Sequence, residues 1–214
     1  MISVYLVDDH ELVRTGIRRI LEDERGIKVV GEAGDGETAV QWCRKNEADV
    51  ILMDMNMPGI GGLEATRKIL RFQAHAKIIV LTIHTEDPFP TKVMQAGASG
   101  YLTKGATSPE VLQAIRQVAH GQRYLSPEIA QQMALSQFNQ SEENPFKTLS
   151  ERELQIMLMI TNGEKVSEIS EQLNLSPKTV NSYRYRLFAK LGIGGDVELT
   201  RLAIRYKMLD TGQF

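Results

Sequence analysis

Cysteine is nearly absent from this chain, which has only Cys43 among its 214 residues. A single cysteine excludes a disulfide framework and any metal site built from several cysteines. No apolar run approaches the roughly 18 residues that a helix needs to cross a bilayer. The first residues also lack a basic segment followed by an apolar signal core. We therefore expect a soluble cytoplasmic protein with no membrane partner.

A strong excess of charge of either sign is also missing. The formal net charge of −2 excludes a strongly basic chain, although it leaves room for a local basic surface. Hydrophobic residues make up 42% of the chain and charged residues 24%, as in an ordinary soluble globular protein. The length suits one large domain or two ordinary ones.

Five apolar segments alternate with helical patterns over residues 1–120. The predicted strands cover residues 2–7, 27–30, 50–53, 78–83 and 101–102, the last of them stopping near residue 104. The final helix begins at Ser108 with a hydroxyl N-cap and has Pro109 at its first position. This alternation predicts a doubly wound parallel sheet, that is, a flavodoxin-like (βα)5 domain.

Polar side chains stand where the predicted strands end. Asp8 and Asp9 follow the first strand, and Asp54 ends the third. Thr82 and Lys104 stand at the ends of the fourth and fifth. Right-handed crossovers bring the carboxyl ends of parallel strands to one edge, where ligands bind in such sheets. Asp54 alone could simply end a strand and make a turn, but the convergence of three carboxylates, a hydroxyl and an ammonium group favours a site.

These residues, with Tyr101 on the fifth strand, resemble the receiver domain of two-component response regulators over about residues 1–120. The resemblance implies Mg²⁺-dependent phosphoryl transfer from a sensor histidine kinase to Asp54, the phosphoacceptor. Asp9, Asp54 and the backbone oxygen of Asn56 would bind the metal. Asp8 would act through the metal's water molecules.

Lys104 and Thr82 would then hold the phosphoryl oxygens, the first as a point charge and the second by a hydrogen bond. Thr82 and Tyr101 would also act as switch residues that respond to the added charge. Taken alone, each could equally be an ordinary strand residue. The sequence departs from common receivers at two positions: Gly105 stands where many have proline, and Ile83 where a smaller residue is common.

Two rival interpretations use the same residues. A phosphohydrolase of the haloacid dehalogenase type also has an aspartyl nucleophile at a strand end, but it needs a second acid where this chain has Asn56. His84 could be a metal ligand, although a lone histidine beside a site is more often a solvent-facing neighbour. In the receiver family, the positions of Asn56 and His84 tune the loss of the phosphoryl group. We therefore expect no enzymatic activity beyond the Mg²⁺-dependent gain and loss of that phosphoryl group on Asp54.

The pattern changes after residue 121. A short helix is predicted after Pro127 and includes Ile129 and Met133. The polar, turn-prone run 136–147 completes a linker over residues 121–147. A second, all-α domain is predicted over residues 148–214, where Ser150 and Glu153 have capping-box spacing. Its four helices are expected near residues 150–161, 166–173, 177–191 and 197–204, and they include a helix-turn-helix unit.

The third of these helices concentrates basic charge. Between Ser176 and Lys190 it has four basic residues and no acidic one. Val180, Leu187 and Leu191 form an apolar stripe at helical spacing, which leaves a basic, hydrogen-bonding face outward. Such a face suits a recognition helix in the major groove, although a merely solvated basic face is the alternative. The candidate contacts are Lys178 and Arg186 with phosphate and Asn181, Ser182 and Tyr185 with the bases. Thr179 is a further candidate for DNA binding.

The segments 149–153 (LSERE) and 175–181 (LSPKTVN) resemble the DNA-binding domain of the NarL/FixJ (LuxR-type) response regulators. Segments 57–68, 121–124 and 176–187 are most similar to the subgroup typified by GacA, UvrY and VarA. The resemblance implies a transcription factor that is phosphorylated by a hybrid sensor histidine kinase. It would bind duplex promoter DNA as a homodimer joined through its fourth helix. The alternative is a receiver-containing interaction protein whose C-terminal helices bind protein or RNA, but Tyr185 alone offers an outward aromatic ring for stacking RNA bases.

Overall fold

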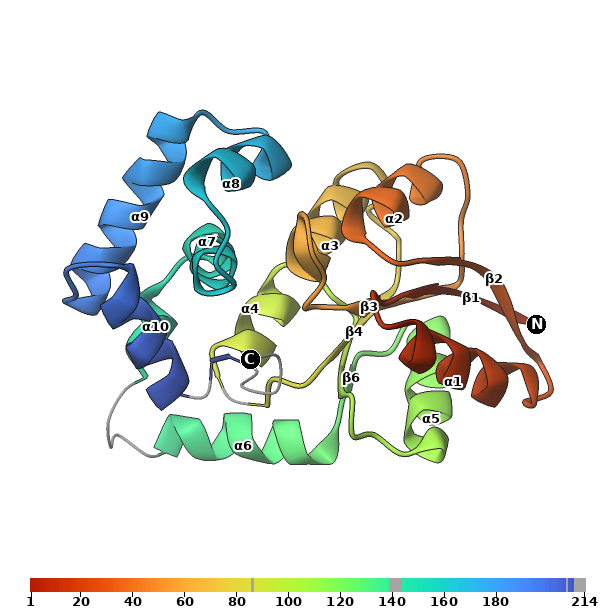
Figure 1. The fold of residues 1–214 in the computed structure, drawn as a ribbon. Coiled ribbons are helices and arrows are strands. Elements are labelled where there is room, and N and C mark those ends of the chain that lie inside the picture. The colour runs from red at the N-terminus through yellow and green to blue at the C-terminus, as the bar shows by residue number, and fades with distance from the viewer. Residues whose placement is uncertain (86, 139–143, 207, 210–214) are drawn as a thin grey trace. The chain divides into compact units, whose positions relative to one another are not determined.

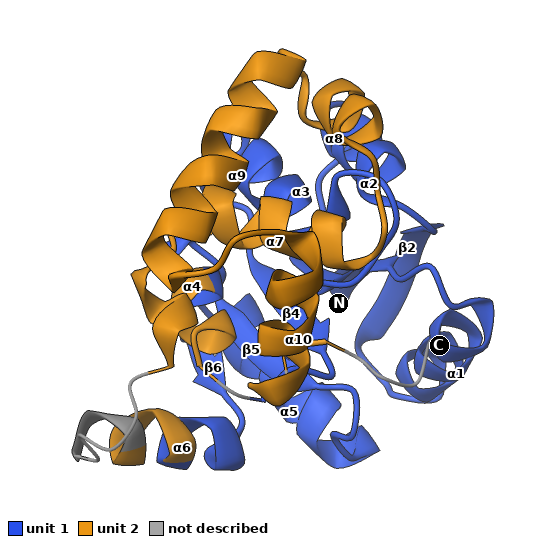
Figure 2. Ribbon diagram, turned by 60° about the vertical axis from the view of Figure 1, so that its left-hand side comes forward, with its two compact units in different colours: residues 1–85, 93–131 blue, residues 86–92, 132–214 orange. Residues whose placement is uncertain are grey.

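The computed structural model describes residues 1–85, 87–138, 144–206 and 208–209, without the side chains of 136–138. The chain divides into two compact units, residues 1–85 with 93–131 and residues 86–92 with 132–214 (Figure 2). Part of the predicted linker, residues 139–143, and the end of the predicted second domain, residues 210–214, lie outside the described residues. Among the described helices, none is both long and apolar enough to cross a bilayer.

The first unit is built on a parallel sheet of six strands in the order β2-β1-β3-β4-β5-β6 (Figure 1). The predicted doubly wound α/β fold is therefore confirmed. The central strand β3 is buried along its whole length, as its unbroken apolar run predicts. The strands are β1 (Ile2–Val7), β2 (Ile27–Ala33), β3 (Val50–Asp54), β4 (Ile78–Thr82), β5 (Gly100–Thr103) and β6 (Tyr124–Leu125).

The sixth strand departs from the five-strand prediction. The sequence predicts that residues 121–126 lead directly into a helix, but Tyr124 pairs with Gly100 and Leu125 pairs with Tyr101. The Tyr124 backbone N–H donates to the oxygen of Ser99 at 3.0 Å. β6 covers backbone groups of β5 that would otherwise form an open sheet edge. Two residues are too few to show a strand pattern in the sequence.

Helices cover both faces of this sheet. Figure 1 shows α1 and α5 on one face and α2 and α3 on the other. The core between the sheet and α5 includes Leu6, Leu52 and Leu81 from the strands, packed with Ile115 and Val118. The helices are α1 (Glu11–Glu22), α2 (Gly36–Cys43), α3 (Gly61–Phe72), α4 (Phe89–Gln95), α5 (Ser108–Ala119) and α6 (Pro127–Phe138).

The second unit contains the four helices that the sequence predicts, preceded by a short 3-10 turn. The Ser150 hydroxyl and the Glu153 side chain form the expected capping box at the start of the first. Asn174 has the left-handed φ of 52° in the tight turn of the helix-turn-helix unit, and Gly192 with φ 65° ends the following helix. These elements are η1 (Pro145–Thr148), α7 (Glu151–Thr161), α8 (Val166–Leu173), α9 (Pro177–Leu191) and α10 (Asp196–Arg205).

Candidate functional site

Three carboxylates gather at the carboxyl edge of the sheet. Asp54 is the last residue of β3, and Asp8 and Asp9 follow β1. Asp54 is only 1% exposed and Asp8 only 3%, so both acids are withdrawn from solvent. A cluster of possible metal-binding atoms, one from each residue and all within 4.8 Å of one another, comprises Asp8, Asp9, His10 and Asp54.

Lys104 lies between two of these acids. Its Nζ is 2.9 Å from Oδ2 of Asp54 and 3.0 Å from Oδ2 of Asp8. Its backbone N–H donates to the oxygen of Thr82 at 2.7 Å, which fixes its place just after β5. Burial lowers the pKa of Lys104, but the facing carboxylates outweigh this and raise it above its ordinary value. The ammonium group is therefore held charged beside Asp54.

The surroundings of Asp54 make an uncompensated negative charge there costly. Burial raises the pKa of Asp54 to about 7, the Lys104 ammonium opposes that rise, and the nearby Asp8 adds to it. One ammonium group thus does not fully offset the cost of a buried carboxylate with like charges around it. The cluster has the charge and the hard oxygen donors that a divalent cation such as Mg²⁺ prefers, so its residues fit such an ion.

Close backbone packing fixes the segment that follows Asp54. The Gly62 N–H donates to the oxygen of Met55 at 3.0 Å, and a Cβ on Gly62 would lie 1.9 Å from the backbone oxygen of Asp54. Only glycine allows this approach. Glu37 accepts a hydrogen bond from the Ile60 N–H at 3.1 Å and so holds the segment from the side of α2.

Thr82, Tyr101 and Asn56 meet at His84. The Thr82 hydroxyl oxygen accepts from the His84 N–H at 3.1 Å, and the buried Tyr101 hydroxyl donates to the His84 oxygen at 2.8 Å. The Asn56 amide nitrogen lies 2.9 Å from Nε2 of His84. His84 is only 4% exposed, so the prediction of a solvent-facing histidine is wrong. Thr82 and Tyr101 bind the His84 backbone, and Asn56 contacts its ring.

The outward face of α9 lies largely where the sequence predicts it. Lys178, Tyr185 and Arg186 are exposed, with Tyr185 at 69%. Thr179, Asn181 and Ser182 are half-buried. The buried stripe differs in one position, because Leu191 is only partly buried whereas Phe188 is buried beside Val180 and Leu187. Helical spacing alone does not identify Phe188, because it points about 100° away from Leu187, at the border of the stripe.

Two of the four basic residues on α9 are bound within the second unit. Arg184 forms a paired hydrogen bond with Asp196 of α10, with Nε 2.8 Å from Oδ1. Lys190 Nζ lies 2.7 Å from Oε2 of Glu153 and 3.1 Å from the oxygen of Thr148. These contacts leave Lys178 and Arg186 as the outward basic residues of this helix.

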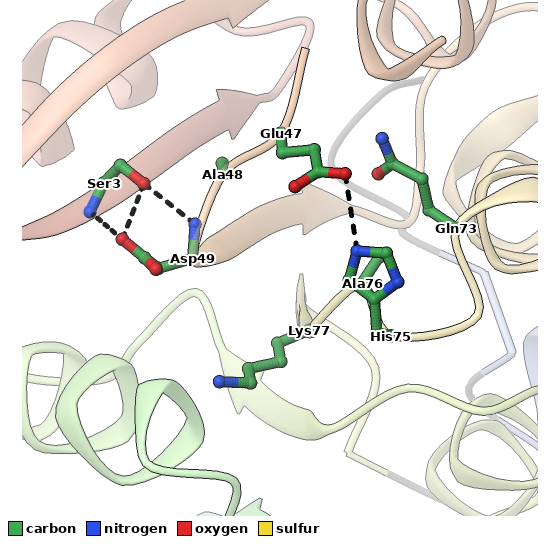
Figure 3. A pocket seen from close by; sticks show the side chains of 8 residues that line it. All are labelled: Ser3, Glu47, Ala48, Asp49, Gln73, His75, Ala76 and Lys77. Atoms are coloured by element: carbon green, nitrogen blue, oxygen red, sulfur yellow. Dashed lines mark hydrogen bonds and ion pairs between the residues drawn. The ribbon is translucent and has the colours of Figure 1, made fainter.

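A pocket of about 190 Å³ opens at the other edge of the sheet, where β1, β3 and β4 begin (Figure 3). Oδ2 of Asp49 accepts from both the backbone N–H and the hydroxyl of Ser3 at 2.7 Å, and these hydrogen bonds lower the pKa of Asp49. Nε2 of His75 lies 3.5 Å from Oε1 of Glu47. The hydrogen bonds tie β1 to the start of β3, which is a structural role for Asp49.

Three features of the carboxyl edge are missing from the sequence argument. His10 shares the acidic cluster, Glu37 holds the segment after Asp54, and His84 contacts Asn56 through its ring and the switch residues through its backbone. Only His10 carried a direct signal, because it follows the acidic pair immediately. Glu37 is distant in sequence from its partner, so no local pattern marks its contact.

Comparisons with known families match both units of the chain. Residues 4–116 match the family described as "Response regulator receiver domain". Residues 147–203 match the family described as "Bacterial regulatory proteins, luxR family". The two matched segments follow one another in the order that the sequence predicts.

Curated relatives cover almost the whole chain. Response regulator UvrY of Escherichia coli strain K12 is 73% identical over 207 residues, which are 96% of this chain and 95% of that protein. Response regulator GacA of Pseudomonas aeruginosa is 60% identical over 211 residues, which are 98% of this chain and 99% of that protein. The predicted resemblance to the GacA and UvrY subgroup is thus confirmed.

A solved structure is similar over nearly the same length. RcsB from Salmonella enterica serovar Typhimurium, bound to promoter rprA in the presence of the phosphomimetic BeF3−, has a TM-score of 0.76 and 26% identity. The match covers 94% of this chain and 98% of that one. This solved regulator therefore resembles the chain over both units, the parallel α/β unit and the helical unit that follows it.

Proposed function

This chain belongs to the LuxR-type family of two-component response regulators, which regulate transcription by binding DNA, and we propose that Asp54 is the switch that controls its output. Asp54 would take a phosphoryl group from a sensor histidine kinase of the hybrid type. The observation that carries the proposal is the contact of Lys104 with Asp54 and Asp8 inside a buried acidic cluster. A cation held against a carboxylate is what a phosphoryl acceptor requires.

The transfer is a displacement at phosphorus. An oxygen of Asp54 forms the new O–P bond as the P–N bond to the kinase histidine breaks, and the imidazole nitrogen keeps that electron pair. Lys104 stabilises the charge on the phosphoryl oxygens. Asp9, Asp54 and the backbone oxygen of Asn56 would hold Mg²⁺, with Asp8 acting through water. When bound, Mg²⁺ would neutralise further negative charge during transfer.

Thr82 and Tyr101 would convert this event into a conformational change. The phosphoryl group adds about −1.5 to −2 charge beside Thr82, and the Thr82 hydroxyl would turn to donate to it. The His84 N–H would then lose the acceptor that it has at 3.1 Å. Since the Tyr101 hydroxyl also bonds to His84, both switch residues would move with the same residue. The result is a shift in population between two receiver states.

On α9, Lys178 and Arg186 would contact DNA phosphates, and Asn181, Ser182 and Tyr185 would read the bases. Thr179 would be a further DNA contact. Phosphate contacts position a protein on DNA and base contacts specify the sequence. We infer a homodimer on a two-fold symmetric promoter site, joined through α10. Val197 and Ile204, both exposed apolar residues of that helix, support this seam.

The remaining assignments follow from this role. We place the receiver at residues 1–120, the linker at 121–147 and the DNA-binding domain at 148–214. The protein would work in the cytoplasm, where promoter DNA and the kinase's catalytic part are found. Its own chemistry would end with gain and loss of the phosphoryl group, so it would be no enzyme for a separate substrate.

Labelling the full chain with acetyl phosphate and Mg²⁺ tests the acceptor. We expect a mass gain of one phosphoryl group, located at Asp54 by peptide mapping after borohydride reduction. Asp54→Asn should remove the label, and Asp23→Asn, which changes an exposed acid in the same unit, should keep it. Labelling that persists in Asp54→Asn would overturn the assignment.

The output is tested with a pool of random-sequence duplexes. The phosphorylated chain should enrich one sequence class, and Arg186→Ala should weaken binding to it. Arg25→Ala removes the same charge from an exposed turn of the first unit and should bind as wild type. A competition in which single-stranded RNA displaces the duplex at equal concentration would favour an RNA-binding output instead.

A further inference from the structure

A histidine stands within the acidic cluster, and the proposed phosphoryl transfer does not use it. His10 follows Asp9 directly and is the N-cap residue of α1. Its Nδ1 lies 2.9 Å from Oδ1 of Asp9 and 3.5 Å from Oδ1 of Asp8. The ring is therefore close enough to share one cation with the carboxylates around Asp54.

Short contacts hold the backbone around His10. The His10 N–H donates to Oδ1 of Asp8 at 2.8 Å, and the His10 oxygen accepts from the Arg14 N–H at 3.0 Å. The Arg14 guanidinium donates to the backbone oxygen of Asp8 at 2.6 Å. The imidazole side chain itself is half exposed. A fixed backbone with a partly free ring allows a nitrogen to turn toward an ion without displacing the loop.

We propose that His10 supplies an imidazole nitrogen to the divalent cation of this site and thereby favours first-row transition cations over Mg²⁺. The inference rests on the proposed metal site at Asp9 and Asp54. Mg²⁺ prefers oxygen ligands and retains its water, so a nitrogen donor adds little to its affinity. Imidazole suits transition cations, whose affinities rise from Mn²⁺ to Co²⁺ for a given site.

The second histidine near the cluster is placed differently. His84 is buried, and its Nε2 is 2.9 Å from the Asn56 amide nitrogen. It is not part of the group of possible metal-binding atoms formed by the described residues. If a histidine nitrogen is found to bind the cation, we therefore expect it to belong to His10, and the His10→Ala variant tests that assignment directly.

Calorimetric titration of the full chain with Mg²⁺, Mn²⁺ and Co²⁺ gives the first test. His10→Ala should lower the affinity for Co²⁺ about tenfold, by analogy with the usual loss on removing a group that supports a metal. It should lower Mn²⁺ affinity less and leave Mg²⁺ within about twofold. The control is His75→Ala, which also removes a histidine paired with a carboxylate but at the other edge of the sheet (Figure 3).

Electron spin-echo spectroscopy of the Mn²⁺-loaded chain gives a second test that does not depend on activity. With ¹⁵N-labelled histidine, the wild type should show a histidine nitrogen coupled to Mn²⁺, and His10→Ala should lose it. If the coupling is absent from the wild type or persists in His10→Ala, His10 is not a ligand. Equal losses for all three cations in His10→Ala would also overturn the inference. Failure of every cation to bind the wild type would instead overturn the proposed metal site itself.

Discussion

Lys190 of α9 and Glu153 of α7 form an ion pair, with Nζ 2.7 Å from Oε2. The same carboxylate oxygen accepts from the backbone N–H and the hydroxyl of Ser150, at 2.7 and 2.9 Å. One buried acid therefore caps α7 and ties it to the helix that is proposed to bind DNA. Lys190 is a structural cation of the second unit, unlike the outward Lys178.

Lys190→Met should destabilise the second unit without removing a DNA contact. It leaves the Glu153 carboxylate without its cation. Because Ser150 still donates to that carboxylate and the Lys190 side chain is 40% exposed, we expect a loss of about 0.5–1 kcal/mol. Hydrogen exchange of α7 and α9 amides in the full chain measures this. Lys178→Met is the matched control, which should leave exchange unchanged and reduce the salt dependence of duplex binding. If instead Lys178→Met changed the exchange and Lys190→Met changed the salt dependence, the two lysines would have the opposite roles.

The contribution of this ion pair should decrease as pH falls. Burial raises the pKa of Glu153, but hydrogen bonds from Lys190 and Ser150 outweigh it and hold the pKa below its ordinary value. A depressed folded-state pKa gives stability that is present above the unfolded pKa and is lost as pH falls through the folded one. The difference in exchange between wild type and Lys190→Met should therefore shrink from pH 7 toward pH 3. If the difference in exchange stayed the same across this pH range, protonation of the Glu153 carboxylate would not be what weakens the ion pair.

Gly62→Ala should disrupt the acceptor site from a position outside the acidic cluster. Its Cβ would lie 1.9 Å from the backbone oxygen of Asp54, so either α3 or the end of β3 must move. We expect a loss of about 1–3 kcal/mol or more in unfolding free energy and weak labelling by acetyl phosphate. Gly16→Ala is the control, because nothing lies within 4 Å of its Cβ inside α1. That variant should gain about 0.5–1 kcal/mol.

Strand ends were predictable because a parallel sheet carries all its carboxyl ends on one edge. Asp8, Asp54 and Lys104 each follow an apolar run, and topology alone brings them together. The helices of the second unit were predictable for a similar reason, since capping residues and helical spacing are local. Ser150 and Asn174 mark such boundaries within a few residues of sequence.

Contacts between distant residues were beyond the sequence. The charge of Lys190 is visible in the sequence, but its partner Glu153 lies 37 positions away, so a cation that pairs within the unit looks the same as one that faces outward. The partners of the buried His84 likewise include Tyr101 and Asn56, which come from other segments. Local sequence patterns predict which face of an element a residue lies on, but its contacts on that face depend on tertiary packing.

Replacing the acceptor should stabilise the metal-free chain, but only at high pH. The pKa of Asp54, raised to about 7 mainly by burial, exceeds its unfolded value of 3.8. Stability from this group is then fully present below the unfolded pKa and is lost as pH rises through 7. Asn is uncharged throughout, so Asp54→Asn should have a higher Tm than wild type at pH 8 and a similar one at pH 5.

Thermal unfolding of the full chain at both pH values, with and without Mg²⁺, measures this effect. Mg²⁺ should raise the Tm of the wild type at pH 8 and narrow its difference from Asp54→Asn, because a cation stabilises the charged site. Asp23→Asn, at an exposed acid, should match the wild type under each condition. An equal Tm gain for Asp54→Asn at pH 5 and pH 8 would mean that burial of a charge at Asp54 is not its cause. In that case the variant would be relieving packing strain, and Mg²⁺ would leave the difference unchanged.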